Sequence, residues 1–178
     1  MTREAAVAVM IGAALLILLA MWWGWSRRRR RDAGLQAPLG DIPAGAETLA
    51  TAHGFYVATT AHDKPLDRLG IHPLTFRSRV TVTVTTAGVA LDIPGAPRVF
   101  LAADRLRATG RATWTIDRVV EDGGLPFIAW AVADDVIADS YFRVQDADPA
   151  DVLDAVARIL PQPETPPRPE TTPTGQQS

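Results

Sequence analysis

The sequence predicts a mainly β domain that follows an N-terminal transmembrane helix and is closed by a C-terminal α-helix. An uncharged, mostly apolar run covers residues 5–25. Alternating apolar and polar residues, separated by glycine and proline turn signals, fill much of residues 48–144, which is typical of half-buried antiparallel strands. After Asp148 the spacing of the apolar residues changes to a helical period.

The apolar run at 5–25 has the length of a membrane span. A helix of its 21 residues is about 32 Å long, close to the ~30 Å hydrocarbon core of a bilayer. A cleaved signal peptide is the alternative, but its apolar region has only roughly 7 to 15 residues and its charge comes first. Three tryptophans lie at the C-terminal end of the run, where amphipathic rings prefer the headgroup region: Trp22, Trp23 and Trp25.

Consecutive arginines follow the span and predict its orientation. Only Arg3 and Glu4 carry charge ahead of the span. Because a basic block is retained on the cytoplasmic side, we expect the N-terminus outside and the C-terminal domain in the cytoplasm. The block either also attracts anionic lipid or only sets the topology, and we favour the second interpretation. Its members are Arg27, Arg28, Arg29, Arg30 and Arg31.

Composition divides the chain into four parts. Residues 1–31 form the anchor with its arginine run. Residues 32–46 mix glycine and proline without a period, which predicts a flexible linker. Residues 47–160 have the ordinary length of one domain. Residues 161–178 are rich in proline and nearly devoid of apolar side chains, so we expect a disordered tail.

The clearest predicted strand covers residues 75–86. Phe76, Val80, Val82 and Val84 alternate with polar residues and are expected on its buried face. A hairpin follows at Gly88, whereas residues 61–73 are rich in turn signals. The other predicted strands are shorter and cover residues 55–60, 89–93, 98–102, 113–120, 126–132 and 136–144.

The C-terminal helix has clear start and stop signals. Asp148 is a favourable N-cap, Pro149 occupies the first helical position, and Pro161 ends the helix. One apolar stripe runs along it and is expected to cover an open end of the β structure. The stripe consists of Val152, Leu153, Val156, Ile159 and Leu160.

Several short strands followed by one helix is the element order of a pleckstrin-homology (PH) fold. Two local motifs add to this order: Gly123-Gly124-Leu125 leading to Trp130, and Asp139-Ser140-Tyr141-Phe142-Arg143 before the helix. With its span and arginine run, the chain resembles the bacterial single-pass membrane-anchored PH-like domain proteins over residues 5–160. This resemblance implies a seven-stranded, partly open β-barrel closed by the helix, anchored in the bacterial cytoplasmic membrane. It supplies no catalytic residues.

No motif in the sequence predicts catalysis. Cysteine is absent, and His53, His62 and His72 lack the compact spacing of metal ligands. Neither a glycine-rich phosphate loop nor a G-x-S-x-G nucleophile motif occurs. We therefore expect no enzymatic activity, no cofactor and no metal site.

Basic residues are concentrated in the first part of the predicted domain. Residues 68–118 have a net charge of +5 and residues 119–160 a net charge of −7. Two arginines of the strand at 75–86 share one face, and two near 106 would do so if their segment is extended. Converging guanidinium groups suit a phosphate, whereas a solvated face that pairs with the acidic half is the favoured alternative. The candidate anion or headgroup residues are Arg77, Arg79, Arg105, Arg107 and Arg111.

These observations lead to one principal function and one alternative. The principal hypothesis is a cytoplasmic PH-like protein-interaction or scaffold module in an envelope or transport assembly, with an unknown protein partner. The alternative is a domain that binds phospholipid headgroups through the arginine face. We expect the chain to cross the membrane once and to bind no nucleic acid.

Overall fold

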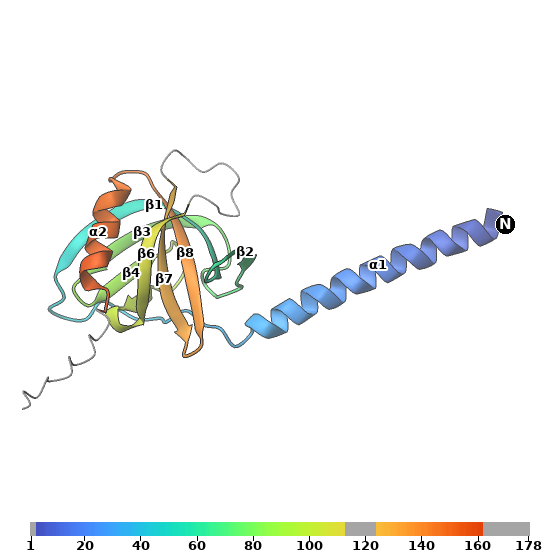
Figure 1. The fold of residues 1–178 in the computed structure, drawn as a ribbon, viewed down its shortest axis with the longest axis horizontal. Helices are drawn as coiled ribbons and strands as arrows, with labels where there is room; N and C mark the ends of the chain where they lie inside the picture. Colours follow the sequence, from blue (N-terminus) through green and yellow to red (C-terminus); the bar gives the residue numbers. More distant parts are fainter. Residues whose placement is uncertain (1–2, 113–123, 162–178) are drawn as a thin grey trace, which may run out of the picture.

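The computed structural model describes residues 3–112 and 124–161 (Figure 1). A long N-terminal helix projects from a β domain, and a second helix packs on that domain. In chain order the elements are α1 (Arg3–Asp32), β1 (Thr48–Ala61), β2 (Lys64–Arg68), β3 (Ser78–Thr85), β4 (Gly88–Asp92), β5 (Val99–Ala102), the 3₁₀-helix η1 (Ala103–Arg105), β6 (Leu106–Ala112), β7 (Leu125–Ala133), β8 (Val136–Val144) and α2 (Pro149–Ile159).

The eight strands form one antiparallel sheet that is open between β5 and β6. Its continuous order is β5-β4-β3-β1-β8-β7-β6, and the short β2 pairs separately with β1. The seven strands of this path, with the C-terminal helix, have the architecture expected for a PH-like fold. Sequence reasoning did not anticipate β2, which lies inside the turn-rich segment 61–73.

Strand β1 joins the two halves of the sheet. Its first part pairs with β3 and its second part with β8, and the two pairings overlap from Gly54 to Tyr56. A Cβ atom at Gly54 would collide with the backbone carbonyl of Arg143, so a close approach of two strands requires glycine here. The predicted strand at 55–60 therefore covers less than half of β1, because the first part of β1 contains small and polar residues.

The core lies inside the curved sheet and under α2. Helix α2 contacts β1, β3, β4 and β6, and it buries Val152, Ala155 and Val156. Asp148 caps this helix by accepting a hydrogen bond from the backbone of Ala150 at 2.8 Å, as the N-cap prediction requires. The largest fully buried side chains around this helix and sheet include Trp130, Tyr56, Ile71, Leu74, Leu91 and Leu101.

Buried polar side chains link β1, β7 and β8 through the core. Trp130 Nε1 donates to Ser140 Oγ at 2.9 Å, and Ser140 Oγ lies 2.8 Å from Thr59 Oγ1. The Tyr56 hydroxyl lies 2.8 Å from Thr59 Oγ1 and donates to the carbonyl of Leu74 at 2.7 Å. Burial raises the pKa of Tyr56 to about 12. Trp130 and Ser140 come from the two motifs that carry the resemblance, so these motif residues stabilise the core.

Several predicted elements match the structure closely. Strand β8 has the predicted bounds, β7 extends the predicted strand by one residue at each end, and a turn at residues 134–135 joins them. Strand β6 was not predicted, because its short, small side chains give no clear apolar alternation. The predicted strand at 113–120 and the tail from residue 162 onward lie outside the described residues.

The expected burial of Phe76 is wrong. Val80, Val82 and Val84 are buried as predicted, but β3 begins only at Ser78 and the Phe76 side chain is 78% exposed. The pairing of β1 with β3 begins on the β3 side at Ser78, opposite Tyr56, so the chain has not yet joined the sheet at residue 76. The hydrophobic alternation in the sequence therefore begins before the backbone pairing does.

The segment at 32–46, expected to be a flexible linker, is packed along the edge of the domain. Phe100 donates its backbone N–H to the carbonyl of Pro38 at 2.9 Å, and Gly40 donates to the carbonyl of Arg98 at 3.2 Å. Ala37 is buried. The unpaired backbone groups of edge strand β5 supply these partners, which glycine and proline composition does not reveal. The segment thus covers one of the two open edges of the sheet.

Candidate membrane-proximal site

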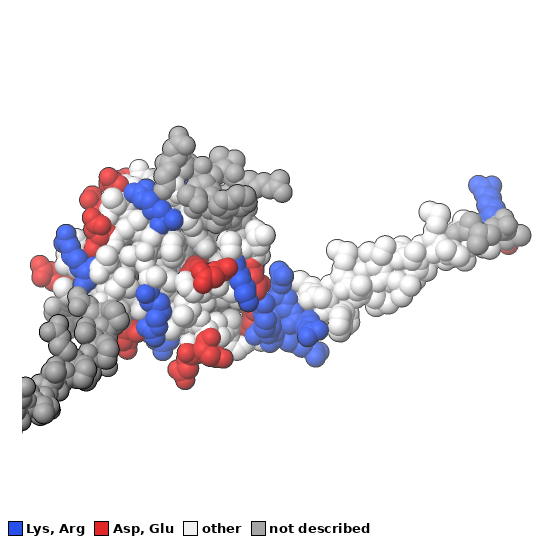
Figure 2. Space-filling view, in the orientation of Figure 1, with Lys and Arg blue, Asp and Glu red and all other residues white. Residues whose placement is uncertain are grey.

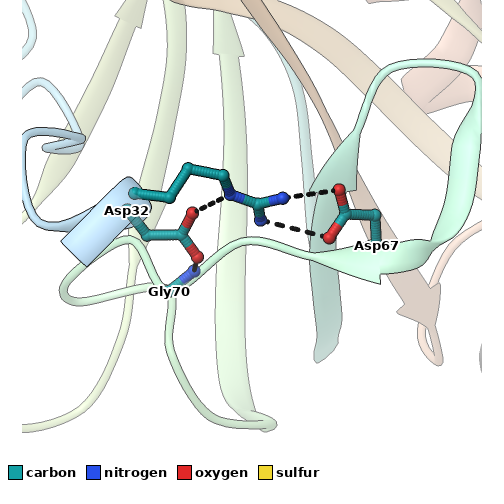
Figure 3. Close-up of polar contacts among 4 residues, drawn as sticks. Asp32, Asp67 and Gly70 are labelled. Carbon is teal, nitrogen blue, oxygen red and sulfur yellow. Dashed lines mark hydrogen bonds and ion pairs between the residues drawn. The ribbon is translucent and has the colours of Figure 1, made fainter. Parts of the chain in front are cut away.

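The C-terminal end of α1 is bound to the loop region between β1 and β3. Arg31 contacts Asp67 with two hydrogen bonds, Nη1 to Oδ2 at 2.9 Å and Nη2 to Oδ1 at 3.1 Å (Figure 3). Arg31 Nε donates to Asp32 Oδ1 at 2.7 Å, and Asp32 Oδ2 accepts the backbone N–H of Gly70 at 3.2 Å. We call these four residues the helix clamp. It joins the end of α1 directly to β2 and the turn that follows it.

Charge strengthens the helix clamp. The Arg31 hydrogen bonds hold the pKa of the Asp67 carboxyl below its usual value, and burial opposes this only partly. The positive charges of Arg28 and Lys64 act in the same direction on Asp67. Asp32 is buried, so its carboxylate is stabilised by the two donors it accepts from.

The length of α1 determines the level of the clamp relative to a membrane. α1 is long and apolar enough to cross a bilayer, and none of its apolar window is buried in the protein. Arg27 lies over the Trp23 ring at 5.7 Å, within the predicted interface group of tryptophans and arginines. Seven residues at 1.5 Å each separate Trp25 from Asp32, which is about 10 Å. The clamp therefore lies at about the level of the lipid headgroups when Trp25 is at the interface.

A cavity of about 520 Å³ opens where α1 meets the domain. We call it the junction cavity. Arg28 and Arg68 contribute positive charge to its wall, while Trp25 and Phe76 contribute aromatic surface. Arg68 is oriented by a hydrogen bond from its Nη2 to the carbonyl of Thr75 at 2.8 Å. The remaining lining residues are Asp32, Ala33, Leu69, Gly70 and Thr75.

A second groove, of about 450 Å³, runs along the other side of the same helix end. Arg28, Arg31, Lys64, Pro65, Leu66 and Asp67 line it. Leu66 is 79% exposed although it belongs to a β-strand. The helix end is thus flanked by basic residues and by the exposed side chains of Leu66 and Phe76.

The densest basic cluster of the molecule lies at the end of α1. Figure 2 shows lysine and arginine gathered where α1 meets the domain, while acidic residues lie both near this end and over α2, where some arginines lie among them. Asp148, Asp151 and Asp154 are exposed acids of α2 and its N-cap. The densest basic cluster therefore lies at the end of α1, and α2 carries exposed acids at the other end of the domain.

The five arginines proposed from the sequence do not form one group. Arg79 lies near the start of β3, and Arg105 lies in η1, directly after β5. Strand pairing aligns Thr85, at the far end of β3, with Gly88 and then with Ala102. Six residues of strand, about 20 Å, therefore separate Arg79 from the end at which η1 lies.

Local structure explains the positions of the other candidate arginines. Because Arg105 is in a 3₁₀-helix, it lacks the extended arrangement that would align it with Arg107. Arg107 Nη1 donates to the carbonyls of Asp104 and Leu106. Arg77 lies over the Phe55 ring at 5.7 Å, and Arg111 forms an ion pair with Asp148 at 3.7 Å. A headgroup site built from all five arginines is therefore not assembled here.

The sequence matches the family model described as bacterial PH domain-like over residues 19–158. The chain belongs to the bacterial PH domain-like family. A search of the curated proteins finds no match. PH-like domains are generally non-catalytic and commonly bind proteins or lipids.

Histidine pairs in this bacterial PH-like domain are structural contacts. His62 Nδ1 lies 2.7 Å from Asp139 Oδ1, and this hydrogen bond raises the pKa of His62. His53 contacts Asp146 through both its backbone N–H and its ring, which lowers the pKa of Asp146. Within residues 3–112 and 124–161, no cluster of His, Asp and Glu could hold a metal ion.

Sequence reasoning did not identify the residues around the junction cavity as a site. In the segment from His62 to Arg68 the charges nearly cancel, so it appeared neutral. The structure shows that Arg31 pairs with both Asp67 and Asp32, and that Arg28 and Arg31 lie beside Lys64 and Arg68, so the residues that line the two cavities have a net positive charge. One signal was present in the sequence: Leu66 is the one large apolar residue between His62 and Arg68.

Proposed function

We propose that this chain is a single-pass protein of the bacterial cytoplasmic membrane whose PH-like domain binds anionic phospholipid headgroups in the junction cavity. Its N-terminus lies outside, and the domain lies in the cytoplasm because the arginine run follows the span. The observation that carries the proposal is the position of Arg28 and Arg68 beside Trp25, where α1 leaves the membrane. We propose the junction cavity in place of the site predicted from the five arginines. The two have in common that guanidinium groups bind phosphate.

The chemistry of the cavity suits a phospholipid. A guanidinium group donates two parallel hydrogen bonds to phosphate oxygens, and Arg68 is already oriented by Thr75. Trp25 and Phe76 supply apolar surface for the glycerol and the first methylene groups of the acyl chains. A lipid in the surrounding leaflet reaches such a site by lateral diffusion, because the cavity opens beside the helix.

A protein-interaction or scaffold role is the second candidate, and the exposed acids of α2 support it. The exposed acids of α2 point away from the membrane side, where an anionic leaflet does not compete for a basic partner. In this proposal the clamped domain presents α2 to a partner in an envelope or transport assembly.

Lipid retention by the full-length protein tests the first proposal. The protein would be purified from membranes of defined phosphatidylglycerol and phosphatidylcholine content and examined by native mass spectrometry. We expect the Arg68→Gln variant to retain several-fold less phosphatidylglycerol than the wild type, while phosphatidylcholine retention is unchanged. Arg79→Gln is the matched control, because Arg79 is exposed and lies outside the junction cavity. Equal lipid retention by both variants would refute headgroup binding at this cavity.

Site-specific crosslinking tests the scaffold role. A photo-crosslinking residue at Asp154 is expected to capture one discrete protein in intact membranes, and Asp151→Arg should weaken that product. The same crosslinker at Arg107, on β6, serves as the control. A product that is equally abundant in the Asp151→Arg variant would contradict a role for the acidic face.

A further inference from the structure

Leu66 and Phe76 are more exposed than the other large apolar side chains of the described residues. They are 79% and 78% exposed, whereas the highest value on the membrane helix itself is 72%, at Met10. Single apolar residues on a surface are common. These two, however, come from separate segments and lie on the same side of the domain, beside the end of α1.

Shared cavities establish the level of both side chains relative to the membrane. Phe76 lines the junction cavity together with Trp25, so Phe76 lies beside the end of α1 that is predicted to be at the interface. Leu66 lines the second groove together with Arg28 and Arg31, the residues that follow Trp25 by about one and two helical turns. Both apolar side chains are therefore at the level where α1 passes through the headgroup layer.

The surroundings of the two side chains complement an anionic lipid surface. Lys64 and Arg68 are their basic neighbours in the same segments. Asp67, which lies between them in sequence, shares Arg31 with Asp32, and Arg28 adds a further positive charge beside them. Basic residues beside exposed apolar side chains are the composition by which protein surfaces bind at the lipid interface.

The clamp connects this surface rigidly to the membrane helix. Asp67 and Gly70, the two domain residues of the helix clamp, flank Arg68 and follow Leu66 closely. β2 itself pairs only with β1, through Arg68 and Lys64, which places the intervening Leu66 on the outside of the domain. Figure 1 shows β2 on the side of the domain toward α1.

We propose that Leu66 and Phe76 insert into the interfacial layer of the same leaflet from which α1 emerges, with Lys64 and Arg68 contacting its anionic headgroups. The occupant of this surface is the lipid bilayer that α1 spans. This inference rests on the proposed membrane topology, but it does not require a lipid bound in the junction cavity. Insertion at these two points, together with α1, fixes the domain in one orientation and directs α2 away from the membrane.

Because the chain has no cysteine, single labels test this insertion directly. Leu66→Cys and Phe76→Cys would each be labelled with an environment-sensitive nitrobenzoxadiazole dye in the full-length protein, reconstituted into vesicles. Ala157→Cys is the control, since Ala157 is an exposed residue of α2. Vesicles would contain a lipid with a nitroxide at a shallow acyl position, which quenches only dyes at the interface.

We expect blue-shifted emission and several-fold stronger quenching at residues 66 and 76 than at residue 157. A second arm without dye avoids any contribution of the label: Leu66→Asp with Phe76→Asp should increase the accessibility of Gly70 and its neighbours to hydrogen exchange in membranes. The proposal is overturned when the dyes at 66 and 76 are as weakly quenched and as polar as the dye at 157.

Two measurements on the Arg68→Gln variant, dye quenching and phosphatidylglycerol retention, separate this inference from headgroup binding in the cavity. Quenching at 66 and 76 that persists in the Arg68→Gln variant, while phosphatidylglycerol retention is equal in that variant and the wild type, supports insertion and refutes the cavity site. Loss of phosphatidylglycerol retention in Arg68→Gln without quenching of either dye supports the cavity site and refutes insertion. Quenching at residue 157 equal to that at 66 and 76 would refute the proposed orientation.

Discussion

Replacing Ser140 by alanine removes the central hydroxyl of the buried polar network. Ser140 is fully buried, accepts the Trp130 indole N–H at 2.9 Å and contacts Thr59 Oγ1 at 2.8 Å. In Ser140→Ala the indole N–H loses its acceptor inside the core, and leaving one buried donor unpaired costs about 1–3 kcal/mol. Thr59 Oγ1 keeps its hydrogen bond with the Tyr56 hydroxyl, so the loss of its contact with Ser140 lowers stability less than the unpaired indole N–H does. We expect a loss of about 2 to 3 kcal/mol in the free energy of unfolding.

Ser78 provides a matched control for this change. Its hydroxyl oxygen is buried and has no hydrogen-bond partner within the described residues. Ser78→Ala removes the same atoms but relieves an unpaired polar group, so we expect no loss of stability or a small gain.

Denaturant unfolding of both variants in detergent micelles, followed by near-ultraviolet circular dichroism, measures the difference. The midpoint should fall for Ser140→Ala and stay constant or rise for Ser78→Ala. Equal midpoints would show that the Trp130–Ser140 contact does not stabilise the core.

Three further predictions concern the clamp, a turn and the helix cap. Asp67→Asn should loosen the junction by about 0.5–1 kcal/mol, seen as faster hydrogen exchange at Gly70. Because the pKa of Asp67 is lowered by Arg31, its stabilisation is complete above the usual carboxyl value of 3.8 and is lost as the pH falls through the lowered value. The thermal midpoint of the wild type should therefore fall more steeply than that of Asp67→Asn below about pH 4, and parallel curves would contradict this assignment. Gly88→Ala should lower the denaturant midpoint strongly, because φ is +151° and a Cβ would meet a carbonyl of β5, whereas Gly34→Ala meets no atom within 4 Å and should be nearly neutral. Asp148→Ala should lower stability by about 1 kcal/mol, and an unchanged midpoint would show that the N-cap is dispensable.

Local patterns were sufficient to predict the elements whose signals lie within one segment. Helix α1 is identified by its uninterrupted apolar run, β8 by its β-prone run between turn signals, and α2 by an N-cap, a proline at each end and one apolar stripe. The PH-like architecture followed from the order of these elements and two short motifs. These signals depend on residues near one another in sequence, which is why they need no knowledge of packing.

Tertiary contacts determined the rest. Phe76 shares the alternation of β3 but lies outside the sheet because pairing with β1 begins only at Ser78. The segment at 32–46 has the composition of a linker, yet it packs on β5 because that edge offers unpaired backbone groups. Neither outcome is encoded in local spacing.

The candidate site also depends on distance in sequence. Arg31 and Asp67 are separated by 36 residues, and their pairing joins the basic end of α1 to Lys64 and Arg68. The sequence by itself determined that the protein has an apolar helix followed by a basic boundary and a β domain, because these are properties of composition and period. Only the tertiary structure decided which domain surface meets that boundary, because the contact between α1 and β2 brings together side chains that no local pattern relates.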